Sequence, residues 1–274
     1  MRDETGYGGK TVLVAGAGRS GLAAAEFLIG RGARVILSDA KAAEQLDAAA
    51  RGLAESSGGM LRLECGAHRA DSFARCDLVV ASPGVPLSLP EFERSRRAGI
   101  PVIAEVELAF RHLRGRIVAI TGSNGKTTTT ALVAHLLQNA GMRAWAAGNI
   151  GLALTGLVSR STPEDVHVVE LSSFQLHWAP SCRPDVGVVL NVAEDHLDWH
   201  GSMGAYAAAK AQVLTGAVAV AGVEDEIAAR LLAASPAPTR IGVRLGAPGP
   251  GELGVADGVL ASRIGAAGGV GGGG

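Results

Sequence analysis

The chain has 274 residues, enough for about two average domains, and its 47% apolar and 19% charged residues exclude a disordered or fibrous protein. Lysine plus arginine, 25 residues, nearly balance aspartate plus glutamate, 26 residues, and there is no basic run. The electrostatic footprint of a protein that binds nucleic acid or an anionic membrane is therefore missing, and we expect neither partner.

The apolar runs, such as residues 217–221, are far shorter than the roughly 18 residues of a membrane-spanning helix. The charged start, Met1-Arg-Asp-Glu, does not resemble a signal peptide. Cys65, Cys76 and Cys182 are widely spaced, which fits neither a disulfide framework nor a metal-binding pair. We expect a cytoplasmic protein with reduced thiols and no membrane insertion.

Short β-branched runs alternate with amphipathic stretches of helical length, a pattern that predicts an α/β fold with parallel sheets covered by helices. The predicted strands are residues 11–15, 34–38, 77–81, 101–103, 116–120, 143–147, 166–170, 185–191 and 217–221. Helical spacing is clearest after Gly21, where Ala23 and Phe27 share a face, and after Lys126.

The break between two series of strands falls in the polar stretch 111–116. We expect a domain over residues 1–113 and a second over 114–264. From about Gly246 the chain is rich in Gly, Pro and Ala without a clear period, so we expect the second sheet to lose its final elements. Seven glycines in residues 265–274 predict a disordered tail.

The first glycine loop, Gly16-Ala-Gly18-Arg-Ser-Gly21, follows a predicted strand and opens a helix, and Asp39 ends the next strand. This context favours an anion at the helix N-terminus, most often the phosphates of a dinucleotide. The alternative is a tight turn in a domain that binds no NAD. A second loop, Ala81-Ser-Pro-Gly-Val-Pro86, also follows a strand and is either a ligand loop or a rigid turn.

The second glycine loop, Thr121-Gly-Ser-Asn-Gly-Lys-Thr-Thr128, has the setting of a phosphate-binding P-loop between a strand and a helix. Ile120 stands where the strict pattern has its first glycine, so the loop is a shortened variant in which Gly122 takes that role. Lys126 can reach phosphate oxygens, and the Thr127 hydroxyl can hold Mg²⁺. A purely structural role for this motif is the less favoured alternative.

Magnesium needs further oxygen ligands, and an acidic residue at the end of a neighbouring strand often supplies one. Glu170 ends such a strand. His196 lies beside Glu194 and Asp195 after another strand, which makes it a site candidate. Composition and spacing alone place Lys210 on the solvated face of a helix over residues 203–214.

Together these motifs resemble the Mur ligase family of ATP-dependent, amide-forming enzymes. The resemblance rests on the P-loop T-G-S-N-G-K-T-T, on Glu170-Leu-Ser-Ser-Phe-Gln-Leu176, and on residues 191–200 followed by Tyr206-Ala-Ala-Ala-Lys210, and it covers about residues 8–245. The last two segments resemble the members that add D-glutamate. The resemblance implies a Rossmann-like N-terminal domain and a P-loop central domain.

The family assigns roles to particular positions. The implied contacts to the UDP part of a nucleotide sugar are Arg19, Ser20, Asp39, Gly84 and Asn149. The implied ATP loop is Gly122, Ser123, Asn124, Gly125, Lys126, Thr127 and Thr128. Two Mg²⁺ ions would be held by Thr127, Glu170, His196 and Lys210, the lysine as its carbamate, and the catalytic residues would be Lys126, His196 and Lys210.

The implied reaction joins D-glutamate to UDP-N-acetylmuramoyl-L-alanine at the expense of ATP, through an acyl phosphate, in peptidoglycan precursor synthesis. The family's third, C-terminal domain and its His-Asn motif are not visible before Gly274, so we expect the 274-residue polypeptide to be truncated and inactive alone. The alternatives are a binding module without turnover, a sibling ligase such as folylpolyglutamate synthase, and an NAD-dependent oxidoreductase.

Overall fold

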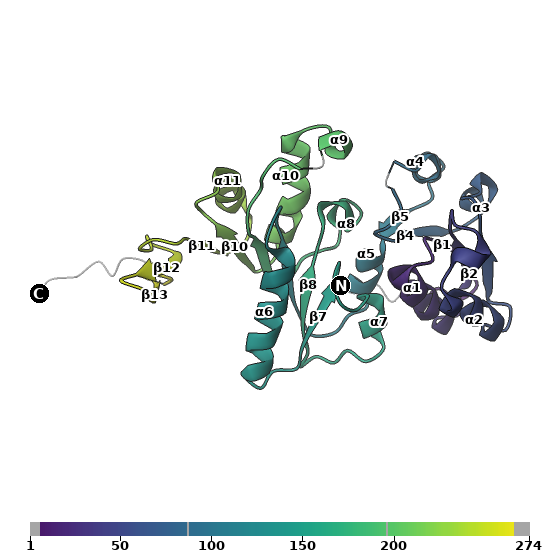
Figure 1. The fold of residues 1–274 in the computed structure, drawn as a ribbon, viewed down its shortest axis with the longest axis horizontal. Helices are drawn as coiled ribbons and strands as arrows, with labels where there is room; N and C mark the ends of the chain where they lie inside the picture. The colour runs from purple at the N-terminus through teal and green to yellow at the C-terminus, as the bar shows by residue number, and fades with distance from the viewer. Residues whose placement is uncertain (1–5, 87, 196, 266–274) are drawn as a thin grey trace, which may run out of the picture. The chain divides into compact units, whose positions relative to one another are not determined.

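The computed structural model describes residues 6–86, 88–195 and 197–265 (Figure 1). The chain divides into two compact units. Unit 1 comprises Met1–Gly115, Ala146–Asp165 and Phe174–Ser181, and unit 2 comprises Arg116–Trp145, Val166–Ser173 and Cys182–Gly274. Each unit is built around one sheet, and the two are described separately.

Unit 1 contains a five-stranded parallel sheet in the order β3-β2-β1-β4-β5. Each strand is followed by a helical segment, as a doubly wound fold requires. The strands are β1 (Thr11–Ala15), β2 (Arg34–Ser38), β3 (Leu61–Glu64), β4 (Leu78–Ala81) and β5 (Val102–Ala104). The helices are α1 (Arg19–Gly30), the 3₁₀ turn η1 (Ala43–Gln45), α2 (Ala48–Ser56), α3 (Ala70–Ala74), α4 (Pro90–Arg97), α5 (Glu105–Phe110) and α7 (Thr155–Val158).

The core of unit 1 lies on both faces of this sheet. Val12 and Val14 of β1 point into a cluster that includes residues of α1, α2 and α5, whereas Leu13 and Ala15 point into a second cluster. Phe73 of α3 and Phe92 of α4 belong to that second cluster. Because successive side chains of a strand alternate between faces, burial on both faces requires the continuous apolar run of β1.

Unit 2 contains most of an eight-stranded sheet in the order β13-β12-β11-β10-β9-β6-β8-β7. The described pairings are parallel except for the antiparallel hairpin β12–β13. The strands are β6 (Arg116–Thr121), β7 (Ala144–Gly148), β8 (Val166–Glu170), β9 (Val186–Val189), β10 (Val218–Gly222), β11 (Thr239–Val243), β12 (Glu252–Ala256) and β13 (Val259–Ser262). The helices are α6 (Lys126–Asn139), α9 (Leu197–His200), α10 (Met203–Ala211), the 3₁₀ turn η2 (Gln212–Thr215) and α11 (Glu226–Ala234). The helix α8 (Ser173–His177) begins at the last residue of a unit 2 segment and otherwise belongs to unit 1.

Three glycines allow backbone segments to pack closer than any side chain would permit. A Cβ atom at Gly187 would overlap the carbonyl of Val213, and one at Gly216 would overlap the carbonyl of Pro184. These contacts press η2 against β9. In unit 1, Gly21 meets the carbonyl of Gly16 in the same way, so the last glycine of the first loop brings α1 close to β1.

The nine predicted strands all form, with ends that shift by one or two residues. The expectation that the second sheet loses its final elements after Gly246 is wrong, because β12 and β13 form there. These two strands pair mainly through their backbones, and their side chains are only partly buried. Such strands lack the apolar alternation that reveals a strand in a sequence. The predicted tail, residues 265–274, lies outside the described residues except for Gly265.

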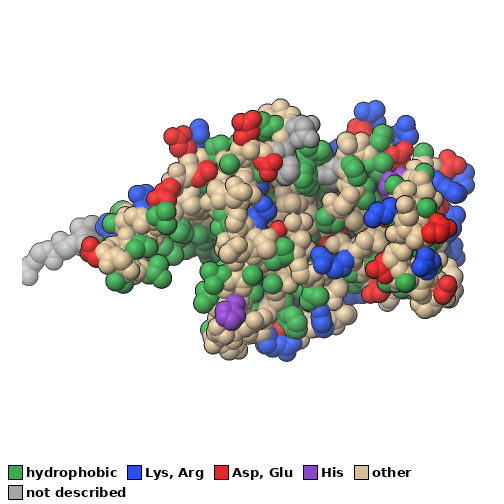
Figure 2. Space-filling view, viewed as in Figure 1, with side chains coloured by type: hydrophobic (Ala, Val, Ile, Leu, Met, Phe, Trp, Pro, Cys, Tyr) green, Lys and Arg blue, Asp and Glu red, His purple; other side chains and the backbone are tan. Residues whose placement is uncertain are grey.

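The face drawn in Figure 2 carries acidic and basic side chains close to one another over both units. Within the residues that the structure describes, no helix is both long and apolar enough to cross a membrane.

The close approach at Gly187 yields a stability prediction. Gly187→Ala forces the β9 and η2 backbones apart, and overpacking of this kind costs about 1–3 kcal/mol. Chemical denaturation should therefore show a lower free energy of unfolding. Gly52→Ala is the matched control, because Gly52 lies in α2 with open space around it. Alanine there should be neutral or stabilising. Equal stabilities of Gly187→Ala and the wild type would contradict this account of the packing.

Candidate functional site

The P-loop of unit 2 connects the end of β6 to the start of α6. Gly125 has a φ of +80°, a left-handed conformation that favours glycine, and α6 begins at the next residue. Of the predicted ATP loop, Gly122 to Gly125 therefore form the connection between β6 and α6, and Lys126 to Thr128 lie in the first turn of α6. Free backbone N–H groups at this position are suited to bind phosphate oxygens.

Asn191, which follows β9, holds this loop in place. Its Oδ1 accepts hydrogen bonds from the backbone N–H groups of Ser123, at 3.1 Å, and Asn124, at 2.9 Å, and its Nδ2 donates to the Asn124 carbonyl at 3.2 Å. Asn191 begins the segment 191–200 that carries part of the family resemblance, but it was not among the predicted site residues. Its position at the end of a strand beside the P-loop strand was the signal that could have identified it.

Two lysine side chains meet at one backbone carbonyl. Lys126 Nζ donates to the Gly122 and Ser123 carbonyls, both at 2.9 Å, and Lys210 Nζ donates to the Gly122 carbonyl at 2.8 Å. Lys210 is 1% exposed, so the expectation that it lies on a solvated face is wrong. Burial, and to a smaller extent the Lys126 ammonium, lower the pKa of Lys210 to about 7, against the opposing effect of Asp195.

Tyr206 joins Lys210 to the P-loop. The Lys210 Nζ lies 4.4 Å from the centre of the buried Tyr206 ring, one turn earlier on α10. The Tyr206 hydroxyl lies 3.0 Å from Ser123 Oγ, which also donates to the Ala193 carbonyl at 2.9 Å and accepts from the Ala193 N–H at 3.0 Å. Because Ser123 has one proton to donate, Tyr206 is the donor in their hydrogen bond. Sequence reasoning missed this contact, which joins residues 83 positions apart.

The predicted magnesium ligands Thr127 and Glu170 are brought together. Thr127 Oγ1 donates to Glu170 Oε2 at 2.8 Å, and Glu170 is buried at the end of β8. A hydroxyl oxygen and a carboxylate oxygen are hard ligands that suit Mg²⁺ when phosphate and water oxygens complete the shell. No group of three His, Cys, Asp or Glu residues suited to a metal occurs among the described residues. His196 lies outside them.

Unit 1 has a cavity of about 410 Å³ at the carboxyl edge of its sheet. All five predicted nucleotide-sugar contacts, Arg19, Ser20, Asp39, Gly84 and Asn149, line it. Ser82 and Pro86, from the loop Ala81–Pro86 that was one candidate ligand loop, also line the cavity, and so do Lys41 and His68, which were not predicted. These residues follow the carboxyl ends of β2, β3 and β4, which is the signal that could have found them.

Asp39 has a structural task in this cavity. Its Oδ2 accepts from the Ala17 N–H at 2.8 Å, and its Oδ1 accepts from the Lys41 N–H at 2.9 Å. Both carboxylate oxygens therefore brace the chain around the cavity. In an NAD site the corresponding acid binds a ribose hydroxyl. Each carboxylate oxygen keeps a further lone pair, so Asp39 can hold the chain and still accept a hydrogen bond from a ligand hydroxyl.

The fold and the two sites define a P-loop nucleotide-binding protein with a doubly wound unit that has its own ligand cavity. Two family models match the chain: "Mur ligase MurD-like, N-terminal domain" over residues 10–104 and "Mur ligase middle domain" over residues 120–246. The chain belongs to the Mur ligase family.

Curated relatives support this membership. The chain is 51% identical, over 92% of its length, to the UDP-N-acetylmuramoylalanine–D-glutamate ligase of Mycolicibacterium vanbaalenii, and 44% identical, over 93%, to that of Rhodococcus jostii. It covers 52% of each relative, so the chain spans about half the length of the curated relatives it matches.

Solved structures share the fold. One is the UDP-N-acetylmuramate:L-alanyl-gamma-D-glutamyl-meso-diaminopimelate ligase of Neisseria meningitides, with a TM-score of 0.58 and 18% identity over 93% of this chain and 84% of that one. Another is the UDP-N-acetylmuramate-alanine ligase of Thermotoga maritima, with a TM-score of 0.50 and 23% identity over 85% of this chain and 52% of that one.

The burial of Lys210 predicts a specific pH dependence of stability. Its pKa is about 7 in the folded chain and near the ordinary 10.5 after unfolding, so between these values the unfolded state binds more protons. The destabilising effect of the buried ammonium is complete below pH 7 and is relieved as the pH rises. Relative to Lys210→Met, the wild type should gain up to about 1.4 kcal/mol of unfolding free energy per pH unit above pH 7.

Chemical denaturation of both proteins between pH 6 and 9, in buffer free of carbon dioxide, measures this difference. A stability difference that stays constant over the whole range would show that Lys210 keeps its ordinary pKa.

Proposed function

We propose that this chain provides the nucleotide-sugar and ATP sites for the ADP-forming ligation of D-glutamate to UDP-N-acetylmuramoyl-L-alanine, in peptidoglycan precursor synthesis. The observation that carries the proposal is the pair of lysines on the Gly122 carbonyl, beside the Thr127–Glu170 pair. The relatives named for this activity support the choice of substrates.

The proposed reaction has two steps. The L-alanyl carboxylate oxygen attacks the γ-phosphorus of ATP, the bond to the β-phosphate oxygen breaks, and ADP leaves with its electron pair. The amine of D-glutamate then attacks the acyl phosphate carbon, an amide forms, phosphate leaves, and the amine gives up a proton. Lys126 neutralises negative charge on the phosphate oxygens, and the P-loop N–H groups orient them.

Thr127 and Glu170 would hold Mg²⁺, which supplies Lewis-acid stabilisation of the phosphate oxygens when it is bound. The residues present fit this role, because both offer oxygen atoms at the start of α6. His196 and Lys210 are the proposed ligands of a second Mg²⁺. As an ammonium Lys210 would repel a cation, so this role requires the carbamate.

Carbamylation of Lys210 is chemically favoured by its surroundings. A pKa of about 7 leaves much of the amine neutral at physiological pH, and only the neutral amine attacks carbon dioxide. The N–C bond forms, one proton is released, and the product is an anion. The neighbouring Lys126 ammonium, which opposes a second cation, stabilises that anion.

The carbamate is testable by ¹³C NMR of the chain equilibrated with ¹³C-bicarbonate at pH 8. One slowly exchanging carbamate resonance is expected, and it should disappear in Lys210→Ala. Lys10→Ala, which removes an exposed lysine, should keep it. A wild-type spectrum without a carbamate signal, or a signal that survives Lys210→Ala, would rule the modification out.

The unit 1 cavity is the proposed site for the UDP part of the nucleotide sugar, and the cytoplasm is the proposed location because ATP and nucleotide sugars are found there. Calorimetric titration should show binding of UDP-N-acetylmuramoyl-L-alanine and none of NADH. Binding of NADH alone would refute the ligase assignment of unit 1, and binding of neither would leave the cavity without its proposed ligand and refute it as well.

The ATP part of the proposal uses the same titration with magnesium and ATP. Lys126→Ala should lower the affinity by about tenfold or more, because a charge-assisted contact to phosphate is lost. Lys10→Ala is the matched control and should bind like the wild type. Equal affinities of Lys126→Ala and the control would contradict the P-loop assignment.

A further inference from the structure

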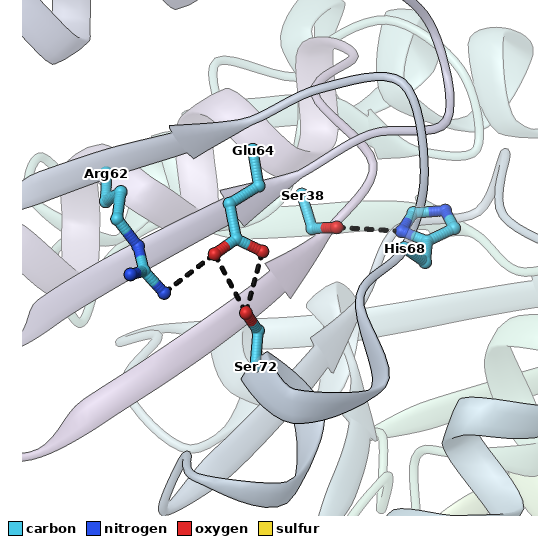
Figure 3. A network of polar contacts seen from close by, with 5 residues as sticks. All are labelled: Ser38, Arg62, Glu64, His68 and Ser72. Carbon is cyan, nitrogen blue, oxygen red and sulfur yellow. Dashed lines mark hydrogen bonds and ion pairs between the residues drawn. The ribbon is translucent and has the colours of Figure 1, made fainter.

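The loop that follows β3 in unit 1 carries a histidine that no motif singled out. His68 lines the 410 Å³ cavity together with the proposed substrate contacts. Its Nδ1 lies 2.9 Å from the Oγ of Ser38, the last residue of β2 (Figure 3). The inference developed from this pair rests on the proposed function of the cavity and adds to it the way in which the ligand is selected.

The contact with Ser38 fixes which ring nitrogen of His68 carries the proton. The Ser38 side chain is fully buried, and His68 Nδ1 is the hydrogen-bond partner that the structure gives its hydroxyl. A buried hydroxyl donates its proton where an acceptor is in reach. Nδ1 is therefore the acceptor and Nε2 carries the hydrogen. His68 thus offers the cavity one N–H donor, at Nε2.

The charge state of His68 agrees with this arrangement. Burial lowers the pKa of its imidazole, against smaller opposing effects of Asp39 and Glu91. The ring is therefore neutral at pH 7, and it acts as a directional hydrogen-bond donor rather than as a cation. Positive charge in the same cavity comes instead from Arg19 and Lys41.

The loop that carries His68 is held at both ends. Glu64, at the end of β3, lies 2.8 Å from Ser72 Oγ of α3 through each of its carboxylate oxygens, and its Oε1 is 2.7 Å from Arg62 (Figure 3). The Gly66 N–H donates to the Lys41 carbonyl at 2.8 Å. These contacts fix the loop that positions His68 before any ligand arrives.

The sheet order indicates which part of a nucleotide His68 meets. The first glycine loop, which suits the phosphates, follows β1, whereas His68 follows β3, two strands away. Neighbouring strands are about 4.8 Å apart, so about 10 Å separates the two strand ends. A nucleoside diphosphate whose phosphates lie at the glycine loop extends its base toward β2 and β3. His68 then faces the edge of the base that is farthest from the ribose.

We propose that His68 is a specificity-determining residue that recognises the base of the nucleotide sugar: its Nε2–H donates to the 4-carbonyl oxygen of uracil. Ser38 is a positioning residue that acts through the tautomer of His68. Cytosine carries an amino group at this position, so two donors would face each other and the cytidine nucleotide is disfavoured. The phosphate contacts are the same for both nucleotides and do not discriminate between them.

The test compares the affinities of UDP and CDP for the purified chain by calorimetry. The wild type should prefer UDP by about tenfold, as expected when a hydrogen bond is replaced by an unpaired buried donor. In His68→Ala the affinity for UDP should fall until the preference disappears, while the affinity for CDP stays the same. His135→Ala, at an exposed histidine on α6 in unit 2, is the matched control and should keep the wild-type preference.

A second variant distinguishes the loss of base recognition from a folding defect. His68→Ala leaves the buried Ser38 hydroxyl without its acceptor, whereas the double variant Ser38→Ala with His68→Ala removes both partners. The double variant should also bind UDP and CDP equally. In Ser38→Ala alone, ¹⁵N NMR of the imidazole should show a mixture of tautomers where the wild type shows Nε2–H, and the preference for UDP should weaken.

The outcomes separate this inference from the proposed function. If the wild type binds neither nucleotide, the proposed function of the cavity fails and the inference fails with it. If the wild type binds UDP and His68→Ala keeps the preference, or loses affinity for UDP and CDP equally, only the inference is overturned. A wild-type imidazole with its proton on Nδ1 would overturn it as well.

Discussion

The Gly122 carbonyl is the point on which the organisation of unit 2 depends. A single backbone oxygen accepts hydrogen bonds from two lysine side chains, one at the start of α6 and one in α10. Burial of the Lys210 ammonium and its repulsion by Lys126 lower the pKa of Lys210, and the partial negative charge of the carbonyl does not offset these two effects. The positive charge of the two lysines favours an anion beside them.

In both units hydrogen bonds from polar side chains hold the backbone of the loops at the candidate sites, but the side chains differ. In unit 2 the side chain of Asn191 and the Tyr206–Ser123 contact hold the P-loop. In unit 1 the Asp39 carboxylate holds the chain around the cavity through backbone N–H groups. In both units polar side chains that might have been taken for ligand contacts serve to fix the backbone. The conformational entropy of the loops is thereby lost during folding and not at binding.

Sequence patterns predicted the parts of this protein that depend on local chemistry. The strand β1, which is buried on both faces, has a continuous apolar run, and the P-loop is defined by consecutive residues from Thr121 to Thr128. The burial of Lys210 was missed because it depends on a carbonyl 88 positions earlier in the chain. The strands β3, β11, β12 and β13 were missed for a related reason, since neighbouring strands stabilise them more than their own side chains do.

The close contacts of Gly21, Gly187 and Gly216 also bear on how the gene can vary. Every nucleotide change that replaces a glycine codon with that of another amino acid introduces a Cβ atom, and at these three positions it would overlap a backbone carbonyl. Glycines such as Gly52 and Gly84 have open space at the same point. Natural selection should therefore remove substitutions at a few glycines of this chain and tolerate them at others.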